Sequence, residues 1–273
     1  MNKSSTPPPP AVTSRIARAA RLGTFVSRTL LTWTRAARPR ADAGVRAELA
    51  VDCARRTLTA LRVDVAIRGD AFLASGPVLT VANHVSWLDV HVLNALGRAR
   101  FVAKAEVRRW PIVGPITAAF GTFFIVRGSF RDAARVKDAI AAALRRGERV
   151  VVFPEGTTTD GTRVGQFYPA LLQAAIDAGA PLQPVAIRYV GIDGRPDPAT
   201  AFIDDMSFAE SLARILARPR IVAEVHVAPP YTASHATRGE LAFATRRWIT
   251  AALLLEDGPQ PEPRRCERLR RAA

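Results

Sequence analysis

Residues 81–90, VANHVSWLDV, hold the side chains of this chain that are best suited to proton transfer. An imidazole whose Nδ1–H is held by a carboxylate keeps Nε2 free to take a proton from a hydroxyl group. His84 and Asp89 are five positions apart, which on one uninterrupted helix would separate them by about 140°. They can meet only if His84 lies in a turn after a strand and Asp89 lies in the first turn of the next helix. A substrate hydroxyl could then attack directly, without a Ser or Cys nucleophile.

This segment is also compatible with a structural role or a metal site. Asn83 and Ser86 are good helix-capping residues, so the fold alone could require a bonded His84 here. A metal site made of His84, Asp89 and His91 would lack any established ligand spacing.

A second polar segment, VVFPEGTTTDG, follows another apolar run, with Glu155, Gly156 and Thr157 in the turn. Glycine permits a tight backbone whose N–H groups can face an anion, and threonine adds hydroxyl donors. The segment is not a P-loop, because the pattern G-x4-G-K-[ST] is absent. A polar turn that caps a helix is the alternative.

Two basic residues also follow apolar runs. Arg127 comes directly after the run in GTFFIVRGS, and Lys104 comes after residues 101–103. A guanidinium group fixed at the end of a strand is suited to bidentate contact with a phosphate, and an ammonium group adds a point charge. The alternative is a basic side chain that simply reaches solvent.

Short apolar runs alternating with helical patterns must position these side chains. Nearly continuous apolar runs are typical of strands covered on both faces, whereas alternation over residues 61–67 and 221–227 indicates half-exposed strands. The covered strands are expected at 78–82, 101–103, 122–126, 150–153 and 185–189, and the helices at 87–96, 133–145, 169–178, 212–217 and 239–254. This order predicts an α/β fold with a mainly parallel or mixed sheet of about seven strands, flanked by helices.

The net charge of +15 is concentrated at the ends of the chain. Residues 1–68 carry a surplus of +9 and residues 257–273 a surplus of +2, so the middle resembles an ordinary folded domain. We therefore expect a disordered leader over 1–14, an amphipathic helical region over 15–60, one domain over 61–256, and a disordered basic tail over 257–273.

Within the N-terminal region, a helical wheel over residues 15–38 separates apolar from basic side chains. The apolar side is expected to hold Leu22, Phe25, Val26, Leu30 and Trp33, with Arg21, Arg28 and Arg35 opposite. Such a helix either packs on the domain or lies in a membrane interface, with its arginines near anionic headgroups.

Composition excludes several classes of protein. A hydrophobic content of 48% excludes a disordered chain, and Cys53 and Cys266 suggest neither a disulfide framework nor a zinc site. No secretory signal is recognisable. The longest uncharged run, residues 110–126, contains two Pro and two Gly, so we expect a helix, a turn and a strand instead of a membrane span. Nucleic-acid binding by the basic ends stays an alternative, although no nucleic-acid-binding motif is present.

Together these segments resemble the glycerolipid acyltransferase family, whose bacterial lysophosphatidate acyltransferases are the best-known members. Order and spacing agree over residues 75–190, and several blocks that agree at once are far more specific than any one alone. The block N-H-x4-D matches Asn83, His84 and Asp89; G-x-x-F-I-x-R matches Gly121, Phe124, Ile125 and Arg127; F-P-E-G-T matches Phe153, Pro154, Glu155, Gly156 and Thr157; and a Pro-Val pair in an apolar strand matches Pro184 and Val185.

The resemblance implies that residues 61–256 are an acyltransferase domain. His84, oriented by Asp89, would be the general base on a lysolipid hydroxyl that attacks the thioester of acyl-CoA or acyl-carrier protein. The expected acceptor is lysophosphatidate, giving phosphatidate in phospholipid synthesis. The residues expected to bind the acceptor are Arg127, Lys104, Glu155, Gly156 and Thr157. No cofactor or metal is implied beyond the acyl donor as co-substrate.

The resemblance also implies a location and partners. We expect a peripheral protein on the cytoplasmic face of the bacterial inner membrane, with a lysolipid, the anionic membrane surface and acyl-carrier protein as partners, and no nucleic acid.

One departure from the family pattern concerns the acceptor. Thr158, Thr159 and Asp160 stand where many lysophosphatidate enzymes have an Arg, and no Lys follows Phe167. Fewer cations make lyso-ornithine lipid, which has no phosphate, the alternative acceptor. A hydrolase that uses His84 and Asp89 to activate water is a third possibility.

Overall fold

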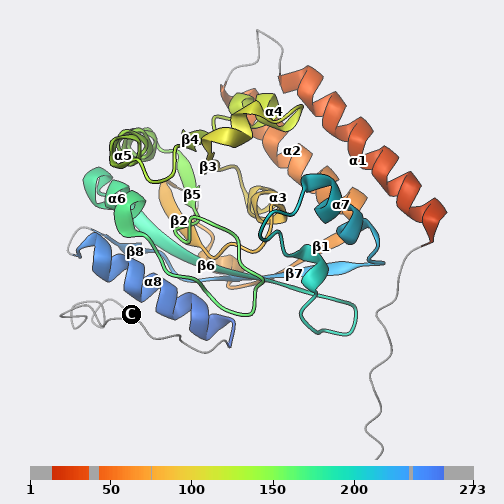
Figure 1. Ribbon diagram of the computed structural model, residues 1–273. Helices are drawn as coiled ribbons and strands as arrows, with labels where there is room; N and C mark the ends of the chain where they lie inside the picture. Colours follow the sequence, from red (N-terminus) through yellow and green to blue (C-terminus); the bar gives the residue numbers. More distant parts are fainter. Residues whose placement is uncertain (1–13, 37–42, 75, 234–235, 255–273) are drawn as a thin grey trace, which may run out of the picture.

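An eight-stranded mixed sheet forms the centre of this α/β protein, whose computed structural model describes residues 14–36, 43–74, 76–233 and 236–254 (Figure 1). The strands are β1 (Val63–Arg68), β2 (Val78–Ala82), β3 (Arg100–Lys104), β4 (Phe123–Ile125), β5 (Arg149–Val152), β6 (Pro181–Val190), β7 (Ile221–Val227) and β8 (Tyr231–Thr232). Their order is β1-β7-β6-β2-β5-β3-β4, with β8 paired to β6. All seven expected strands are present, and the two-residue β8 is an addition.

The strand directions gather the polar segments at one edge of the sheet. β4, β3, β5, β2 and β6 run parallel to their neighbours in this order, whereas β7 and β8 pair with β6 in the antiparallel sense. The segments that follow β2, β3, β4 and β5 therefore open at the same edge, the usual place for a site in an α/β sheet.

Helices cover both faces of the sheet. The helices are α1 (Arg15–Ala36), α2 (Ala43–Leu61), α3 (Leu88–Leu96), α4 (Val113–Ala119), α5 (Phe130–Arg145), α6 (Gln173–Ala178), α7 (Phe208–Leu216) and α8 (Arg238–Ala252), with 3-10 turns at Asp70–Phe72, Ala105–Arg109, Pro169–Leu172 and Pro198–Thr200. α2, α3 and α7 cover one face, and α5, α6 and α8 cover the other. α5 and α7 begin earlier than the apolar pattern predicted, because Ser129 and Ser207 cap their first turns.

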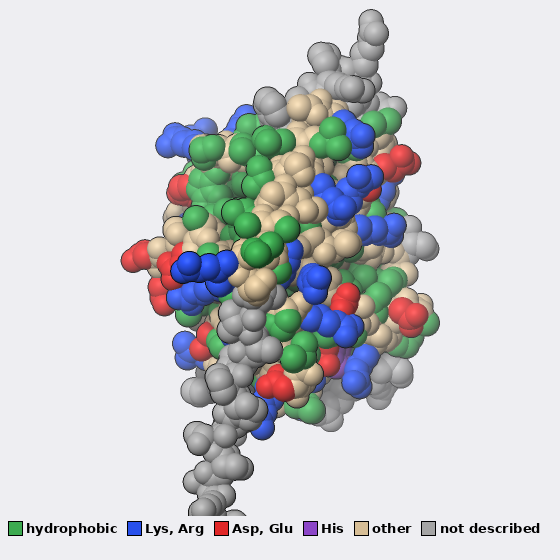
Figure 2. Space-filling model, turned by 90° about the vertical axis from the view of Figure 1, so that its right-hand side faces the viewer, with side chains coloured by type: hydrophobic (Ala, Val, Ile, Leu, Met, Phe, Trp, Pro, Cys, Tyr) green, Lys and Arg blue, Asp and Glu red, His purple; other side chains and the backbone are tan. Residues whose placement is uncertain are grey.

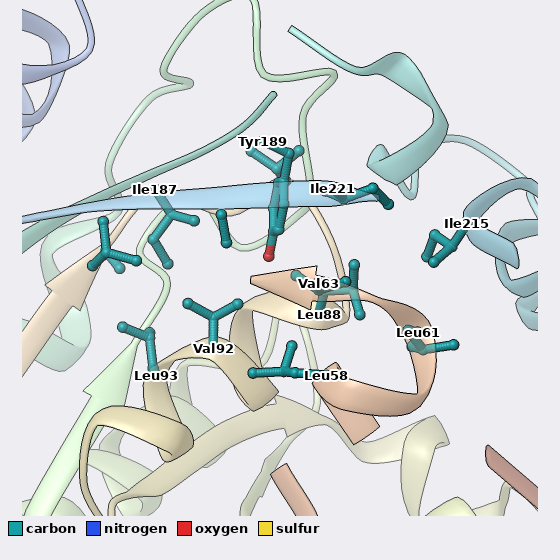
Figure 3. Packing of buried hydrophobic residues seen from close by; sticks show 14 of the residues in the cluster. Leu58, Leu61, Val63, Leu88, Val92, Leu93, Ile187, Tyr189, Ile215 and Ile221 are labelled. Atoms are coloured by element: carbon teal, nitrogen blue, oxygen red, sulfur yellow. The ribbon is translucent and has the colours of Figure 1, made fainter. Parts of the chain in front are cut away.

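Two apolar clusters hold the layers together. The cluster beneath α2, α3 and α7 includes Leu61, Leu88 and Ile187 and is drawn in Figure 3. The cluster on the opposite face includes Leu79 and Ile140, also fully buried. Each such side chain contributes about 1.5–3 kcal/mol, so the sheet is a firm support for the loops at its edge.

The run at residues 110–126 folds as expected from its Pro and Gly content. It forms α4, a turn at Gly121 with φ 76°, and β4. None of the described helices is both long enough and apolar enough to cross a membrane.

The orientation of α1 corrects the helical-wheel expectation. Arg21 does not face solvent; it is 8% exposed and turns into the domain. Its guanidinium donates to the carbonyl oxygens of Ala60, Leu61, Leu216 and Arg218, at 3.4, 2.5, 3.0 and 2.7 Å. These carbonyls lie at the C-terminal ends of α2 and α7, where a cation is favoured.

The apolar residues of α1 are consequently divided. Phe25 is buried, whereas Leu22, Val26 and Leu30 are 40%, 41% and 41% exposed. The side chain of Trp33 is not among those described. The single apolar side expected from the sequence is thus wrong, because the carbonyls at two helix ends attract Arg21 inward. The leader and the tail expected over 1–14 and 257–273 lie outside the described residues, apart from Ser14.

Candidate active site

His84 and Asp89 meet at the carboxyl end of β2. His84 lies in the turn after this strand, and Asp89 lies in the first turn of α3. The Nδ1 atom of His84 is 2.8 Å from Oδ2 of Asp89. The Asp89 side chain is fully buried, whereas that of His84 is 20% exposed. Among the described residues, no hydrogen bond to Nε2 of His84 is recorded.

Asp89 is anchored by donors on both of its oxygens. Oδ2 also accepts from the N–H groups of Val85 and Ser86, at 2.8 and 3.0 Å, and Oδ1 accepts from the Tyr189 hydroxyl at 2.6 Å. These donors hold the Asp89 carboxylate in one orientation. Because a carboxylate only accepts, Nδ1 of His84 is the protonated nitrogen of this bond and Nε2 is the basic one.

The backbone and ring of His84 are fixed as well. Its ring stacks on Phe153, with centroids 4.1 Å apart and an interplanar angle of 12°. Its N–H donates to Oε1 of Glu155 at 2.8 Å, and its carbonyl accepts from the N–H of Thr159 at 2.8 Å. The loop after β5 therefore holds the turn that carries His84.

Glu155 braces this loop from inside. It is 5% exposed, and its second oxygen, Oε2, accepts from the N–H of Gly165 at 2.7 Å. Burial raises the pKa of Glu155 to about 7, against the opposing effect of the two N–H donors. A Cβ at position 165 would come within 2.7 Å of Oε2, so a larger residue there would displace the Glu155 carboxyl group. Glu155 does not reach the surface, where the sequence-based expectation placed a headgroup contact.

The remainder of the expected turn lies at the surface. Gly156, with φ 66°, and Thr157 are both exposed. Thr158 turns inward instead and donates its hydroxyl to the carbonyl of Phe202. Only Gly156 and Thr157 of the F-P-E-G-T block are thus placed where they can touch an acceptor.

Asn83 connects β2 to β6 just beyond the last backbone pair of these two strands. Its side chain donates to the carbonyl of Ile187 at 2.9 Å and accepts from the N–H of Ile187 at 2.8 Å. The first turn of α3 has no side-chain cap bond, and the Ser86 hydroxyl oxygen has no described partner. The alternative role of Asn83 or Ser86 as a cap of this helix is therefore not what the structure shows.

Lys104 and Arg127 lie farther along the same edge. Lys104 ends β3 and Arg127 follows β4, so two and three strand spacings separate them from His84, about 10 and 14 Å. Both are exposed, and neither makes a hydrogen bond or ion pair with another described residue. Burial and the Arg127 charge lower the pKa of Lys104, while Glu106 opposes this. The arrangement offers two neighbouring cations to an anionic group.

His91 does not contact the pair formed by His84 and Asp89. It packs edge-on against Trp87, with ring centroids 5.7 Å apart, and burial lowers its pKa to about 4. Across the described ranges, no group of three His, Cys, Asp or Glu side chains is placed to hold a metal ion.

Sequence reasoning missed Tyr189 and Phe153 as parts of the site. Tyr189 lies near the end of β6 and bonds Asp89, and Phe153 directly follows β5 and stacks on His84. A tyrosine at a buried position of a mainly apolar strand is the signal that could have been used, because its hydroxyl needs a partner.

Comparisons with known proteins identify the family of this chain. Residues 64–188 match the family description "Acyltransferase". The chain is 39% identical over 198 residues to a lyso-ornithine lipid O-acyltransferase of Pseudomonas aeruginosa, covering 72% of this chain and 75% of the relative. It is 35% identical over 175 residues to a 1-acyl-sn-glycerol-3-phosphate acyltransferase of Neisseria meningitidis, covering 64% and 68%.

A solved structure shares the fold. The crystal structure of the lysophosphatidate acyltransferase PlsC from Thermotoga maritima superposes with a TM-score of 0.66 at 19% identity, covering 88% of this chain and 94% of that one.

Proposed function

Because this chain belongs to the glycerolipid acyltransferase family, acting on lysolipids, we propose that it moves a fatty acyl chain from acyl-CoA or acyl-carrier protein to the free hydroxyl of lysophosphatidate, giving phosphatidate. The observation that carries the proposal is the His84–Asp89 pair, whose bonded Nδ1 leaves a basic Nε2 facing out. No second protein nucleophile is needed, because the lysolipid supplies the attacking oxygen.

The reaction balances as a single transfer of the acyl group. Nε2 of His84 takes the proton of the lysolipid hydroxyl as its oxygen attacks the thioester carbonyl. The C–O bond forms, the C–S bond breaks, and the imidazolium returns the proton to the departing thiolate. Asp89 stabilises the imidazolium between these steps.

Lys104 and Arg127 support a phosphate-bearing acceptor. Two adjacent exposed cations without described protein partners suit a dianion, and their gain is mainly in positioning the hydroxyl near His84. Gly156 and Thr157 lie at the surface between these cations and the base, where they can contact the glycerol part. Glu155 serves the acceptor indirectly, by fixing the loop.

Lyso-ornithine lipid is the second candidate acceptor, for a specific reason. Glu106 lies near Lys104 and Arg127, so the cluster combines both signs of charge. Ornithine carries a carboxylate and an ammonium group, which such a cluster could bind together. The Pseudomonas aeruginosa relative bears the name of this activity.

A thiol-release assay with a panel of acceptors tests both candidates. Purified protein with acyl-CoA, or with acyl-carrier protein carrying an acyl chain, should release thiol only when a lysolipid is added. A higher kcat/KM for lysophosphatidate than for lyso-ornithine lipid supports the first candidate, and the reverse supports the second. Free fatty acid without acylated lipid would instead identify a hydrolase, and no release with any acceptor would overturn the proposal.

The outer side of α1 supports a peripheral position on an anionic membrane, which we place at the cytoplasmic face of a bacterial inner membrane. Figure 2 looks onto the side of the molecule where α1 lies, with hydrophobic side chains gathered between groups of Lys and Arg. The exposed apolar residues of α1 are Ile16, Leu22, Val26, Leu30 and Leu31. Insertion of such residues among acyl chains, with arginines at the headgroups, is the usual way for a helix to lie on a membrane.

A further inference from the structure

Tyr189 lies beside the catalytic pair without taking part in the proposed proton transfer. It is near the end of β6 and is 4% exposed, among the apolar residues that pack beneath α3. Figure 3 shows its side chain pointing from the sheet toward Leu88 at the start of α3. Its hydroxyl donates to Oδ1 of Asp89 at 2.6 Å, the bond on the side of the carboxylate away from His84.

The backbone that carries Tyr189 is itself tied to the catalytic turn. Asn83, the residue before His84, bonds both the N–H and the carbonyl of Ile187, two positions before Tyr189. The segment from Asn83 to Asp89 is thus joined to β6 at two points. The Asn83 side chain bonds the backbone of Ile187, and the Asp89 carboxylate bonds the Tyr189 hydroxyl. Movement of this segment or of β6 would displace the bond between Asp89 and His84.

We propose that Tyr189 is a positioning residue that tunes His84 through Asp89. Its hydroxyl fixes the rotation of the carboxylate, so that Oδ2 faces Nδ1 of His84. By sharing the negative charge of Asp89, it also limits how strongly the carboxylate holds a proton on the imidazole. The proposal rests on the assignment of His84 as the base. Burial and the Asp89 charge raise the pKa of Tyr189 well above its ordinary value, so it stays a donor across the working range.

The groups that surround this unit must be separated in any test. Among the described residues, the titratable side chains recorded around Asp89 are His84 on its own turn, Tyr189 on β6 and Glu155 after β5. Glu155 has a pKa of about 7, and the charges of His84 and Asp89 both act on it. The comparison between wild type and a Tyr189 variant is therefore repeated with Glu155→Gln in both proteins, which removes the titration of Glu155.

The direct test is Tyr189→Phe, which removes only the hydroxyl. Without that donor, Asp89 holds the imidazolium more tightly, so His84 needs a higher pH to become a free base. We expect kcat to fall roughly tenfold and KM to stay within about twofold, because Tyr189 touches no substrate. The acid limb of kcat/KM should move up by about half a pH unit or more.

A spectroscopic measurement separates this proposal from the proposed function. The ¹⁵N signals of His84, assigned with His84→Gln, should titrate at higher pH in Tyr189→Phe than in wild type, with no substrate present. If the wild type transfers no acyl chain, the proposed function fails while this comparison still stands. Tyr231→Phe is the matched control, since its hydroxyl also bonds one buried partner, Thr245, away from the site.

If Tyr189→Phe does not fold, the wild-type chain labelled with 3-fluorotyrosine provides a second test. The chain has three tyrosines, so incorporation of 3-fluorotyrosine places a more acidic phenol at position 189. A stronger donor should move the His84 signals in the opposite direction, to lower pH, and this shift should persist in a Tyr231→Phe background. Unchanged His84 titration in the folded Tyr189→Phe variant, or in the fluorotyrosine protein, would overturn the proposal.

Discussion

The catalytic turn, residues 83–89, and the exposed residues that we assign to lipid binding differ in how the fold holds them. In the turn, His84 is fixed through its ring, its N–H and its carbonyl, and Asp89 accepts bonds at both oxygens. Lys104 and Arg127, by contrast, are exposed, and neither forms a hydrogen bond or ion pair with another described residue, although Glu106 lies near both. The fold therefore determines the geometry of the His84–Asp89 pair, while the side chains that we assign to headgroup selection can change without disturbing the core.

Replacing His84 should have the largest effect on activity. His84→Ala is expected to lower kcat about 10³-fold with little change in KM, because general-base catalysis is lost while lipid contacts remain. His84→Gln sharpens the test, since its amide can still bond Asp89 but cannot accept the proton. Thiol release and circular dichroism check activity and folding; activity of either variant within tenfold of wild type would contradict the assignment.

Titration of Glu155 should make the free energy of unfolding depend on pH. Its pKa in the folded protein, about 7, lies above the ordinary value of 4.5, so the folded state holds this proton more tightly than the unfolded state does. The associated stability is fully present below about pH 4.5 and is lost as pH rises toward 7, by about 3 kcal/mol in total.

Glu155→Gln removes this titration. Urea unfolding at pH 5, 6, 7 and 8 should show a wild-type free energy of unfolding that falls relative to the variant as pH rises. Glu210→Gln, at an exposed position of α7, is the control. A difference between wild type and Glu155→Gln that stays constant with pH would contradict the raised pKa.

The exposed apolar residues of α1 are among those that we assign to lipid binding. Changing Leu22, Val26 and Leu30 together to Ser should weaken binding to anionic vesicles roughly 100-fold, because each exposed apolar side chain contributes about 1 kcal/mol in the interface. Co-sedimentation with vesicles measures this, and activity on a water-soluble short-chain lysolipid should stay unchanged. Serine at Ile67, Phe72 and Ile192, which are also exposed, is the matched control; equal losses in the two triple variants would refute docking through α1.

Single cation changes should have the smallest effect. Lys104→Ala and Arg127→Ala are each expected to raise KM for lysophosphatidate roughly tenfold and to leave kcat nearly unchanged, since they bind the headgroup throughout the reaction. Arg247→Ala, at an exposed position of α8, is the control. A loss in kcat at constant KM would place these cations in the chemical step instead.

The structural features that depend on local sequence patterns could be predicted from the sequence. Apolar runs located the seven main strands, and the spacing of His84 and Asp89 required the turn in which the structure places them. The acceptor-side cations followed strand ends, which also are local features. Contacts between distant segments were beyond this reasoning: Tyr189 meets Asp89 from 100 positions away, and Glu155 reaches the N–H of His84 from 71. The inward turn of Arg21 was missed for the same reason, since its partners belong to other helices.

Arg21 also has a consequence for the order in which the chain is completed. Two of its carbonyl partners, Leu216 and Arg218, lie 195 and 197 positions later. At about 5–20 residues per second, a ribosome needs roughly 10–40 s to make that interval. During this time only the earlier partners of Arg21, the carbonyls of Ala60 and Leu61 in α2, are available to it. The last two of the four bonds that turn Arg21 inward therefore form only after α7 has been synthesised.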